Sequence, residues 1–296
     1  MLPDQGAGLR SLLFAPGDRE DLANKALASQ ADGIILDLED AVAPDAKPAA
    51  RATVRALLDS ADRQGKPVFV RINALETGMA LADLAAVLGG RPWGIVVPKC
   101  HLSRDLPLLG HYLDALETRE GLGLGSTRIL AIATETALTT LDLAHAGGLD
   151  CPRLWGVMWG SEDLAASLGA KTNRGADGAY TFPFQMARAQ CLYAAAALGV
   201  VAVDAVWTAF RDSDGLQAET AEGLRDGFAA KAAIHPAQCA IINSMMTPAP
   251  AEVEWAGQVL ELLQDQALAQ LDGRMIDLAH KRIAEKIMAR AQALDL

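Results

Sequence analysis

The sequence has little positive charge. Its 296 residues include 26 Lys and Arg against 37 Asp and Glu, which gives a formal net charge of −11. An acidic chain lacks the uniform electrostatic attraction that general binding to nucleic acid or to an anionic membrane surface requires. We therefore expect neither of these partners.

Paired cysteines and long apolar segments are also missing. The four cysteines, Cys100, Cys151, Cys191 and Cys239, form no CxxC pair and no zinc-spaced cluster with histidine, so we expect free thiols. The longest uncharged apolar stretch, residues 192–203, is too short to span a bilayer, and the first ten residues contain no apolar signal core. We expect a cytoplasmic protein.

The chain further lacks a nucleotide-binding turn. Short apolar runs alternate with longer segments of helical period, which is typical of a parallel sheet with helical crossovers. Eight runs are candidate strands: 11–15, 33–38, 68–72, 94–98, 129–133, 155–159, 200–206 and 232–234. The first of them leads into Ala-Pro-Gly-Asp rather than GxGxxG or GxxxxGK[ST], which disfavours an open doubly wound sheet. Eight units in about 245 residues instead predict a closed (β/α)8 TIM barrel.

Residues 247–250, Thr-Pro-Ala-Pro, end the repeat. We expect two further helices, over about 251–270 and 275–294, the second with apolar residues at near-helical spacing. The sequence thus predicts a barrel domain over residues 10–246 and a C-terminal helical extension over 247–296. The extension either covers its own barrel or packs on a neighbouring subunit of a homo-oligomer.

Polar side chains follow most of the predicted strands. Active sites of (β/α)8 barrels form at the carboxyl ends of the strands. The sequence places these residues there: Asp37, Glu39, Asp40, Arg71, Asn73, Lys99, Glu135, Glu162, Asp163 and His235. So many polar and charged groups at one rim would cost stability through desolvation unless a ligand or metal used them. We therefore predict an active site at this rim.

Glu135 and Asp163 follow neighbouring strands, so their carboxylates can converge on one cation. Mg²⁺ prefers one or two carboxylates and keeps water in its other positions, so we predict a magnesium site here. Asp163 also stands at the start of a helix, where a simple capping role is the alternative.

Arg71 follows a buried apolar run, where a guanidinium suits a bidentate contact to a substrate carboxylate. An ion pair with Asp37 or Glu39 is the alternative, and both can hold together. Near the first strand, Arg10 and further basic residues, Arg19 and Lys25, offer positive charge to a polyanionic ligand.

Seven ordered motifs carry a resemblance to a known family. They are 10–17 (RSLLFAPG), 37–42 (DLEDAV), 70–73 (VRIN), 98–99 (PK), 135–136 (ET), 160–164 (GSEDL) and 233–238 (AIHPAQ). Together they resemble the citrate lyase beta subunit-like branch of the HpcH/HpaI aldolase family. The resemblance implies a (β/α)8 barrel, Mg²⁺ on Glu135 and Asp163, a substrate carboxylate on Arg71, and chemistry at a C–C bond next to an acyl thioester.

Two details narrow the resemblance. Asp40 stands where the pyruvate aldolases of the family have a histidine base, which argues against that branch. Residues 272–277 (DGRMID) look like the tail motif of malyl-CoA and citramalyl-CoA lyases, whose acidic residue enters the active site of the next subunit. A catalytic Asp277 and a homotrimer, or a multiple of three, are therefore implied, although Ala279 stands where a proline commonly follows.

The resulting expectation is a Mg²⁺-dependent carbon–carbon lyase. Its substrate would be the CoA thioester of a hydroxy-dicarboxylic acid, of the citramalyl-CoA or malyl-CoA type, cleaved to a 2-oxo acid and an acyl-CoA. Arg71, Glu135 and Asp277 would be catalytic, and Arg71, Glu135, Arg10 and Asp37 would contact substrate. A malyl-CoA-type thioesterase and a non-catalytic CoA-ester-binding or citrate lyase complex subunit are the alternatives.

Overall fold

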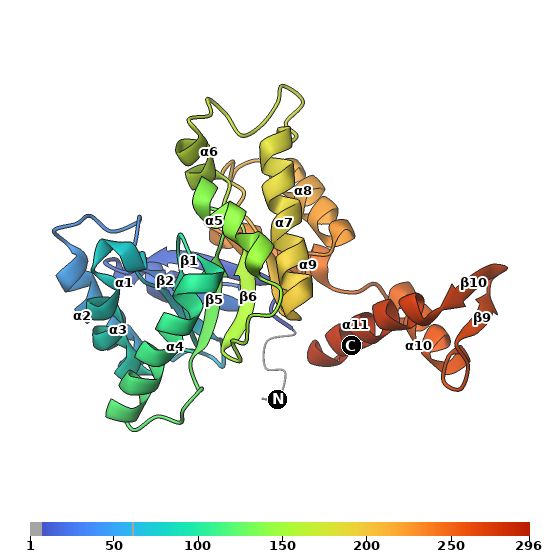
Figure 1. Cartoon of the computed structure of the whole chain (residues 1–296), viewed down its shortest axis with the longest axis horizontal. Coiled ribbons are helices and arrows are strands. Elements are labelled where there is room, and N and C mark those ends of the chain that lie inside the picture. Colours follow the sequence, from blue (N-terminus) through green and yellow to red (C-terminus); the bar gives the residue numbers. More distant parts are fainter. Residues whose placement is uncertain (1–7, 61) are drawn as a thin grey trace.

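The computed structural model describes residues 8–60 and 62–296. Eight parallel strands each pair with the next, and the last pairs with the first to close a barrel (Figure 1). The strands are β1 (Ser11–Pro16), β2 (Gly33–Asp37), β3 (Val68–Arg71), β4 (Gly94–Val97), β5 (Arg128–Ile132), β6 (Leu154–Met158), β7 (Val201–Asp204) and β8 (Ala230–Ala233). The predicted (β/α)8 barrel is confirmed. Only β8 begins clearly earlier than expected, because its buried Lys231 interrupts the apolar run.

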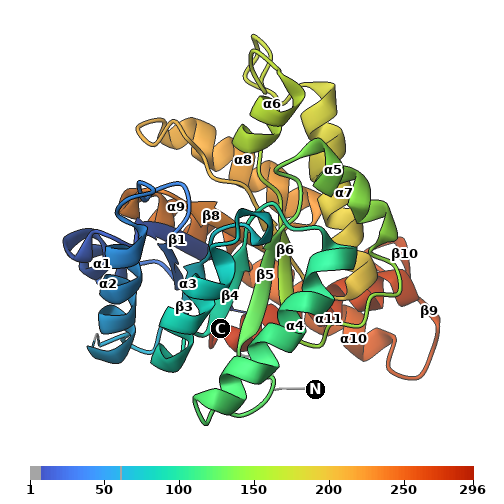
Figure 2. The ribbon, with the colours of Figure 1, turned by 60° about the vertical axis from the view of Figure 1, so that its left-hand side comes forward.

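Helices surround this barrel, as Figure 2 shows from a second side. They are α1 (Glu20–Leu27), α2 (Lys47–Ser60), α3 (Ala80–Val87), α4 (Leu102–Arg119), α5 (Ala137–Asp142), α6 (Glu162–Leu168), α7 (Phe182–Leu198), α8 (Ser213–Asp226) and α9 (Pro236–Met246). Three short 3₁₀ turns accompany them, Leu75–Thr77, Leu88–Gly90 and Leu143–His145. Since strands in such a unit alternate with helices, every loop after a strand opens at the same end of the barrel.

Side chains of each strand alternate between the barrel interior and the helices. Leu12, Ile35, Phe69, Val96 and Leu130 belong to one buried cluster inside the barrel, and their neighbours along the strands pack outward against the helices. The interior is tight: a Cβ added to Gly94 would lie 2.9 Å from the Phe69 ring. The barrel is therefore filled, and ligands can reach only its ends.

The C-terminal extension differs from the two helices expected. It contains α10 (Pro250–Leu262), an antiparallel hairpin of β9 (Leu268–Leu271) and β10 (Arg274–Asp277), and α11 (Leu278–Ala293). Asp272 and Gly273 both have positive φ, 52° and 75°, as a two-residue hairpin turn requires. The end of the first expected helix and the start of the second therefore form the two strands of this hairpin. The hairpin extends away from the barrel (Figure 1).

The extension has a small core of its own, where residues of α10, β10 and α11 pack together. One end of α11 returns to the barrel, because Arg290 donates hydrogen bonds to the backbone oxygens of Met246 and Ala229, at 2.9 and 2.7 Å. The extension is thus tied to the amino end of the barrel, and its hairpin lies free of it.

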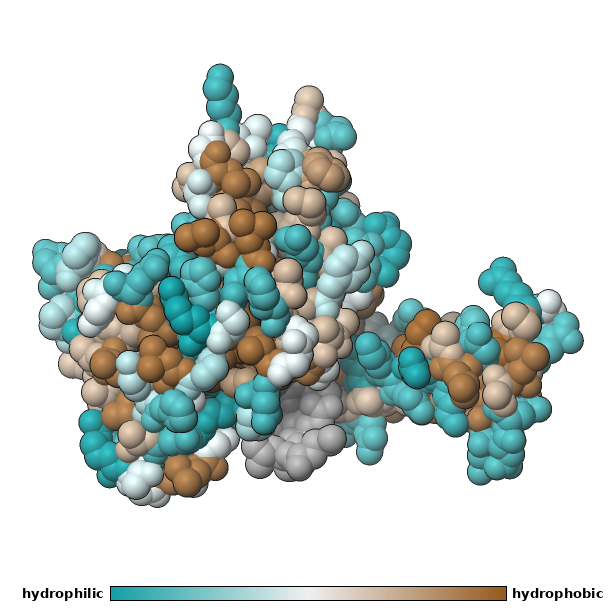
Figure 3. Space-filling view, viewed as in Figure 1, coloured by the Kyte–Doolittle hydropathy of each residue, from teal (hydrophilic) through white to brown (hydrophobic). Residues whose placement is uncertain are grey.

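The surface bears apolar residues that this chain does not cover. Figure 3 shows them gathered over α5 and α6, where the side chains of Leu138 and Leu141 are 69% and 66% exposed. Phe182 at the start of α7 and Met275 in the hairpin are similarly exposed. Within the described parts of the chain, no helix combines the length and the apolar character that a membrane crossing needs.

Candidate active site

Arg71 and Asp37 form the best-defined ion pair at the carboxyl end of the barrel. They end the neighbouring strands β3 and β2, and Arg71 donates from Nε and Nη2 to the two Asp37 oxygens at 2.7 and 2.6 Å. The same oxygens accept from the backbone N–H of Glu39 and Ala41, so Asp37 is fully occupied within the chain. Asp37 therefore fixes the orientation of the Arg71 guanidinium.

The Arg71 guanidinium keeps donor capacity for a ligand. Its carbon lies 5.0 Å from the centre of the Phe14 ring, which supports one face of the planar group. Burial lowers the pKa of Arg71, but the hydrogen bonds and charge of Asp37 outweigh this effect and raise it, so the group stays charged. Because a guanidinium carries five N–H donors and Asp37 takes two, hydrogens on Nη1 and Nη2 remain.

Glu39 lies between the two cations of the rim. One of its oxygens is 2.8 Å from Arg71 Nη1, and the other is 2.5 Å from Lys99 Nζ. Burial raises the pKa of this carboxyl despite both cations. Its Oε2 atom is buried and has no aligned hydrogen-bond donor, although Arg71 is near. A buried carboxylate oxygen in this condition is a position where a cation or a ligand donor can be accommodated.

Glu135 is a buried acid of the site. It follows β5 just beyond the strand end, and its Oε2 accepts a 2.6 Å hydrogen bond from the backbone N–H of Lys99. Burial, together with the charge of Glu39, raises the pKa of Glu135 to about 8. The side chain fits only because residue 160 is glycine, where an added Cβ would lie 2.9 Å from Glu135 Cγ. This carboxyl is held in place and lacks a full counter-charge.

Asp163 completes the group. It lies in the first turn of α6, and one of its oxygens is 3.6 Å from Lys99 Nζ. Lys99 thus contacts Glu135 through its backbone N–H, and Glu39 and Asp163 through its ammonium. Over residues 8–60 and 62–296, no three His, Cys, Asp or Glu side chains form a ready metal cage.

These residues nevertheless fit a divalent cation of the magnesium type. Such an ion needs only one or two carboxylates and takes its other ligands from water and substrate. Glu135 and Asp163 supply two carboxylates, and burial together with the charge of Glu39 raises the pKa of Glu135 although Lys99 and Arg71 are near. The site is thus arranged to hold one cation and one anionic ligand side by side.

The structure does not bring Arg10, a predicted substrate contact, to this rim. Arg10 precedes β1 and therefore lies at the amino end of the barrel, where it pairs with Asp32 at 2.8 Å and donates to Thr247. Arg19 does follow β1, but its exposed side chain pairs with Asp21 at 3.1 Å. Lys25 is exposed on α1. Neither is in contact with the site residues described above.

Asp277 also lies apart from the site of its own chain. It caps α11, where its Oδ1 accepts from the backbone N–H of Ala279 and lies 2.8 Å from Nδ1 of His280. The hydrogen bond from His280 lowers the pKa of this exposed carboxyl. His235 caps α9, accepting from Ala237 N–H at 3.2 Å, and Glu162 accepts from Asn173, so neither is directed at the acidic cluster.

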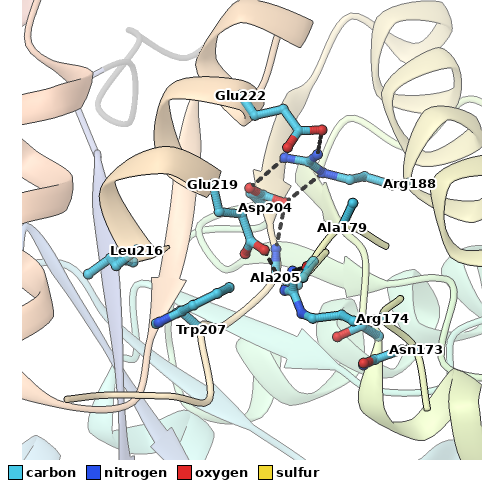
Figure 4. Close-up of polar contacts among 12 residues, drawn as sticks. Asn173, Arg174, Ala179, Arg188, Asp204, Ala205, Trp207, Leu216, Glu219 and Glu222 are labelled. Atoms are coloured by element: carbon cyan, nitrogen blue, oxygen red, sulfur yellow. Dashed lines mark hydrogen bonds and ion pairs between the residues drawn. The ribbon is translucent and has the colours of Figure 1, made fainter. Parts of the chain in front are cut away.

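A second charged cluster lies between β7, β8 and the helices α7 and α8 (Figure 4). Asp204 accepts hydrogen bonds from Trp159 and Arg188, and the buried ammonium of Lys231 lies 3.2 Å from Asp204 and 2.9 Å from Glu219. Burial raises the pKa of Asp204, but Lys231 and Arg188 outweigh it and lower the value. Because these charges compensate one another, the cluster stabilises the barrel and offers no reactive group.

The sequence places Lys99 at the rim but assigns it no role, and the structure shows it in contact with Glu39, Glu135 and Asp163. The four cysteines are free, as expected, and burial raises the pKa of each of them, so they are poor nucleophiles.

Comparisons with known proteins agree with this geometry. The sequence profile described as HpcH/HpaI aldolase/citrate lyase matches residues 10–236. A (3S)-malyl-CoA thioesterase of Cereibacter sphaeroides is 34% identical over 98% of this chain and 97% of its own length. An L-malyl-CoA/beta-methylmalyl-CoA lyase of the same species is 32% identical over 96% and 95%. The crystal structure of CitE from Mycobacterium tuberculosis with magnesium, acetoacetate and coenzyme A superposes with a TM-score of 0.76, at 33% identity, over 97% of this chain and 99% of CitE.

Proposed function

Because the chain belongs to the HpcH/HpaI aldolase/citrate lyase family, we propose that it is a carbon–carbon lyase acting on a CoA thioester. The substrate is a 3-hydroxyacyl-CoA with a distal carboxylate, of the citramalyl-CoA or malyl-CoA type, and the products are a 2-oxo acid and an acyl-CoA. One observation carries this proposal: a fixed, charged Arg71 stands beside a cluster of acids, Glu39, Glu135 and Asp163.

Mg²⁺ would be held by Glu135 and Asp163. The CitE structure, which contains magnesium and coenzyme A, supports a magnesium site in this family, and the fit of the two carboxylates supports these two residues. When bound, the ion polarises the oxygens of the substrate's hydroxyl and carboxylate as a Lewis acid. Glu135 also borders the substrate, because its carboxyl lies at the same point of the rim as Lys99 and Glu39.

Arg71 orients the substrate. Its remaining N–H groups take the distal carboxylate, and Asp37 holds the guanidinium so that it does not rotate to follow a misplaced ligand. In the cleavage the proton of the 3-hydroxyl passes to water, and the bond between C2 and C3 breaks. The new carbonyl belongs to the 2-oxo acid, and the electron pair stays on C2 as the thioester enolate, which must take up a proton.

Asp277 of a neighbouring subunit is the acid that we propose for this last proton. The hairpin that carries it extends from its own barrel, and the apolar side chains of Leu138 and Met275 are exposed as in proteins that associate. We propose a homotrimer or a multiple of three. The domain boundary lies between residues 246 and 247.

We also propose a cytoplasmic location. The four free cysteines support this location, since disulfides are rare in the cytoplasm.

Complementation between chains tests the shared site. Glu135→Gln and Asp277→Asn chains, each inactive alone, are co-expressed with different tags and purified through both. Mixed oligomers then contain sites with an intact Glu135 from one chain and an intact Asp277 from the other, so we expect activity to return. If the doubly tagged oligomer forms but stays inactive, Asp277 does not act across the interface.

Product analysis tests the reaction itself. Citramalyl-CoA, malyl-CoA and methylmalyl-CoA are each incubated with and without Mg²⁺, and acyl-CoA, 2-oxo acid and free CoA are separated by chromatography. A lyase yields acyl-CoA and a 2-oxo acid in equal amounts, only with Mg²⁺. Hydrolysis to free CoA without a 2-oxo acid would favour the second candidate, a thioesterase, which the 34% identity to the malyl-CoA thioesterase keeps open. If none of the three thioesters gives any product, both the lyase and the thioesterase proposals are contradicted. The non-catalytic subunit is then the remaining candidate.

A further inference from the structure

We propose that Lys99 is a resident counter-charge of the acidic rim, which neutralises the carboxylates while no divalent cation is bound and opposes that cation when it binds. This inference rests on the metal site of the proposed function. The ammonium lies 2.5 Å from Glu39 and 3.6 Å from both Asp40 and Asp163, so it occupies the region where these acids converge.

The backbone of Lys99 fixes this position. Its φ angle is +49°, a left-handed conformation that non-glycine residues rarely adopt and that costs free energy to maintain. In this conformation the N–H of Lys99 donates to Glu135 at 2.6 Å while the side chain reaches Glu39. One residue therefore holds one proposed metal ligand with its backbone and faces the other, Asp163, with its side chain.

No other described cation is available for this task. The remaining cation of the rim, Arg71, has two of its donors on Asp37 and is fixed on the other side of Glu39. Without Lys99, Glu135 and Asp163 would have only Arg71 as counter-charge. The side chain of Lys99 is 23% exposed, so it has access to solvent and is not enclosed by packing.

The charge arrangement sets the direction of the effect. A divalent cation on Glu135 and Asp163 would lie a few ångströms from the ammonium, and a charge of +1 and one of +2 at such a distance repel each other even in water. Removing the ammonium charge should therefore strengthen cation binding by about tenfold, which corresponds to about 1.4 kcal/mol. A lysine that served only as a structural partner of Glu39 would, when removed, leave the affinity unchanged or lower it through disorder.

Calorimetric titration of the metal-free full-length protein with MgCl₂, with no substrate present, tests the inference. The variants are Lys99→Met, which keeps the length of the side chain but not its charge, and Lys99→Arg, which keeps the charge. Lys286→Met, which removes an exposed lysine on α11, is the matched control. We expect Lys99→Met to bind Mg²⁺ about tenfold more tightly, and the other two to stay within about threefold of the parent.

Thermal unfolding is a second measurement, and it shows whether the Lys99→Met variant is folded. The melting temperature of Lys99→Met without metal should fall below that of the parent, and its rise on adding Mg²⁺ should be larger. Unchanged or weaker Mg²⁺ binding by a folded Lys99→Met would overturn the counter-charge role. The Glu135→Gln variant separates the two proposals: if the parent binds Mg²⁺ no better than Glu135→Gln does, the proposed metal site itself is wrong, whatever Lys99 does.

Discussion

The protonation of Glu135 gives a direct test of how this site is built. In the metal-free protein the pKa of Glu135 is raised to about 8 from an ordinary value of 4.5, with burial as the main cause. The folded state therefore binds this proton more tightly than the unfolded chain does. The stabilisation is complete at low pH, begins to fall as the pH rises through 4.5, and is lost by pH 8.

The size of the effect follows from the shift. The pKa of Glu135 differs by about 3.5 units between the folded and unfolded states, which corresponds to about 5 kcal/mol in the free energy of unfolding. This value is an upper bound because the neighbouring acids titrate together with Glu135. Replacement by glutamine removes the titration while it keeps the shape of the side chain. Above pH 8, metal-free Glu135→Gln should therefore be more stable than the parent by about 2 to 5 kcal/mol, whereas near pH 5 the two should differ little.

Urea unfolding of both proteins in EDTA, at several pH values between 5 and 8.5, measures this difference. Glu162→Gln is the matched control, because it removes an exposed acid from the same helix start and should leave the pH dependence of the parent unchanged. Stability curves of the parent and of Glu135→Gln that run parallel over this range would show that Glu135 is ionised throughout, and the argument from its burial would fail.

Three further variants test other parts of the structure. Asp37→Asn weakens the two hydrogen bonds that orient the Arg71 guanidinium. In steady-state assays with the CoA thioester, kcat/KM should therefore fall about 10- to 100-fold, mainly through a higher KM. Lys231→Met leaves Asp204 and Glu219 short of a buried partner and should cost about 3 to 5 kcal/mol in urea unfolding, against less than about 1 kcal/mol for the exposed Arg225→Met. Arg10→Met breaks the pair with Asp32 and should lower stability by about 1 to 2 kcal/mol; a raised KM for the acyl-CoA would instead return Arg10 to the binding site.

The barrel could be predicted because its strands are buried on both faces, so that each appears as a short apolar run in the sequence. The exception is instructive. Lys231 belongs to β8 and is fully buried, but its partners Asp204 and Glu219 come from β7 and α8. A charge that is neutralised by distant residues cannot be distinguished from a loop residue by local pattern alone, and the predicted strand accordingly began too late.

The candidate site was accessible from the sequence for a topological reason. Parallel strands of one barrel end at the same rim, so Arg71, Glu135 and Asp163 had to lie near one another. The same reasoning places Arg10, which precedes its strand, at the opposite end of the barrel. The contacts of Lys99 could not be foreseen, because they depend on a left-handed backbone conformation that the sequence does not specify.

The hairpin of the extension connects these findings to assembly. In a single chain Asp277 is exposed, and the hydrogen bond from His280 lowers its pKa, so it is ionised at neutral pH. An ionised carboxylate cannot give a proton to an enolate, and the acid of the proposed reaction must therefore acquire its proton in other surroundings. Burial against a neighbouring barrel would raise the pKa of Asp277 by desolvation, the effect that already acts on Glu135. On this reasoning, a chain kept apart from its neighbours retains Mg²⁺ binding but loses turnover, because assembly supplies the protonated acid and not the metal ligands.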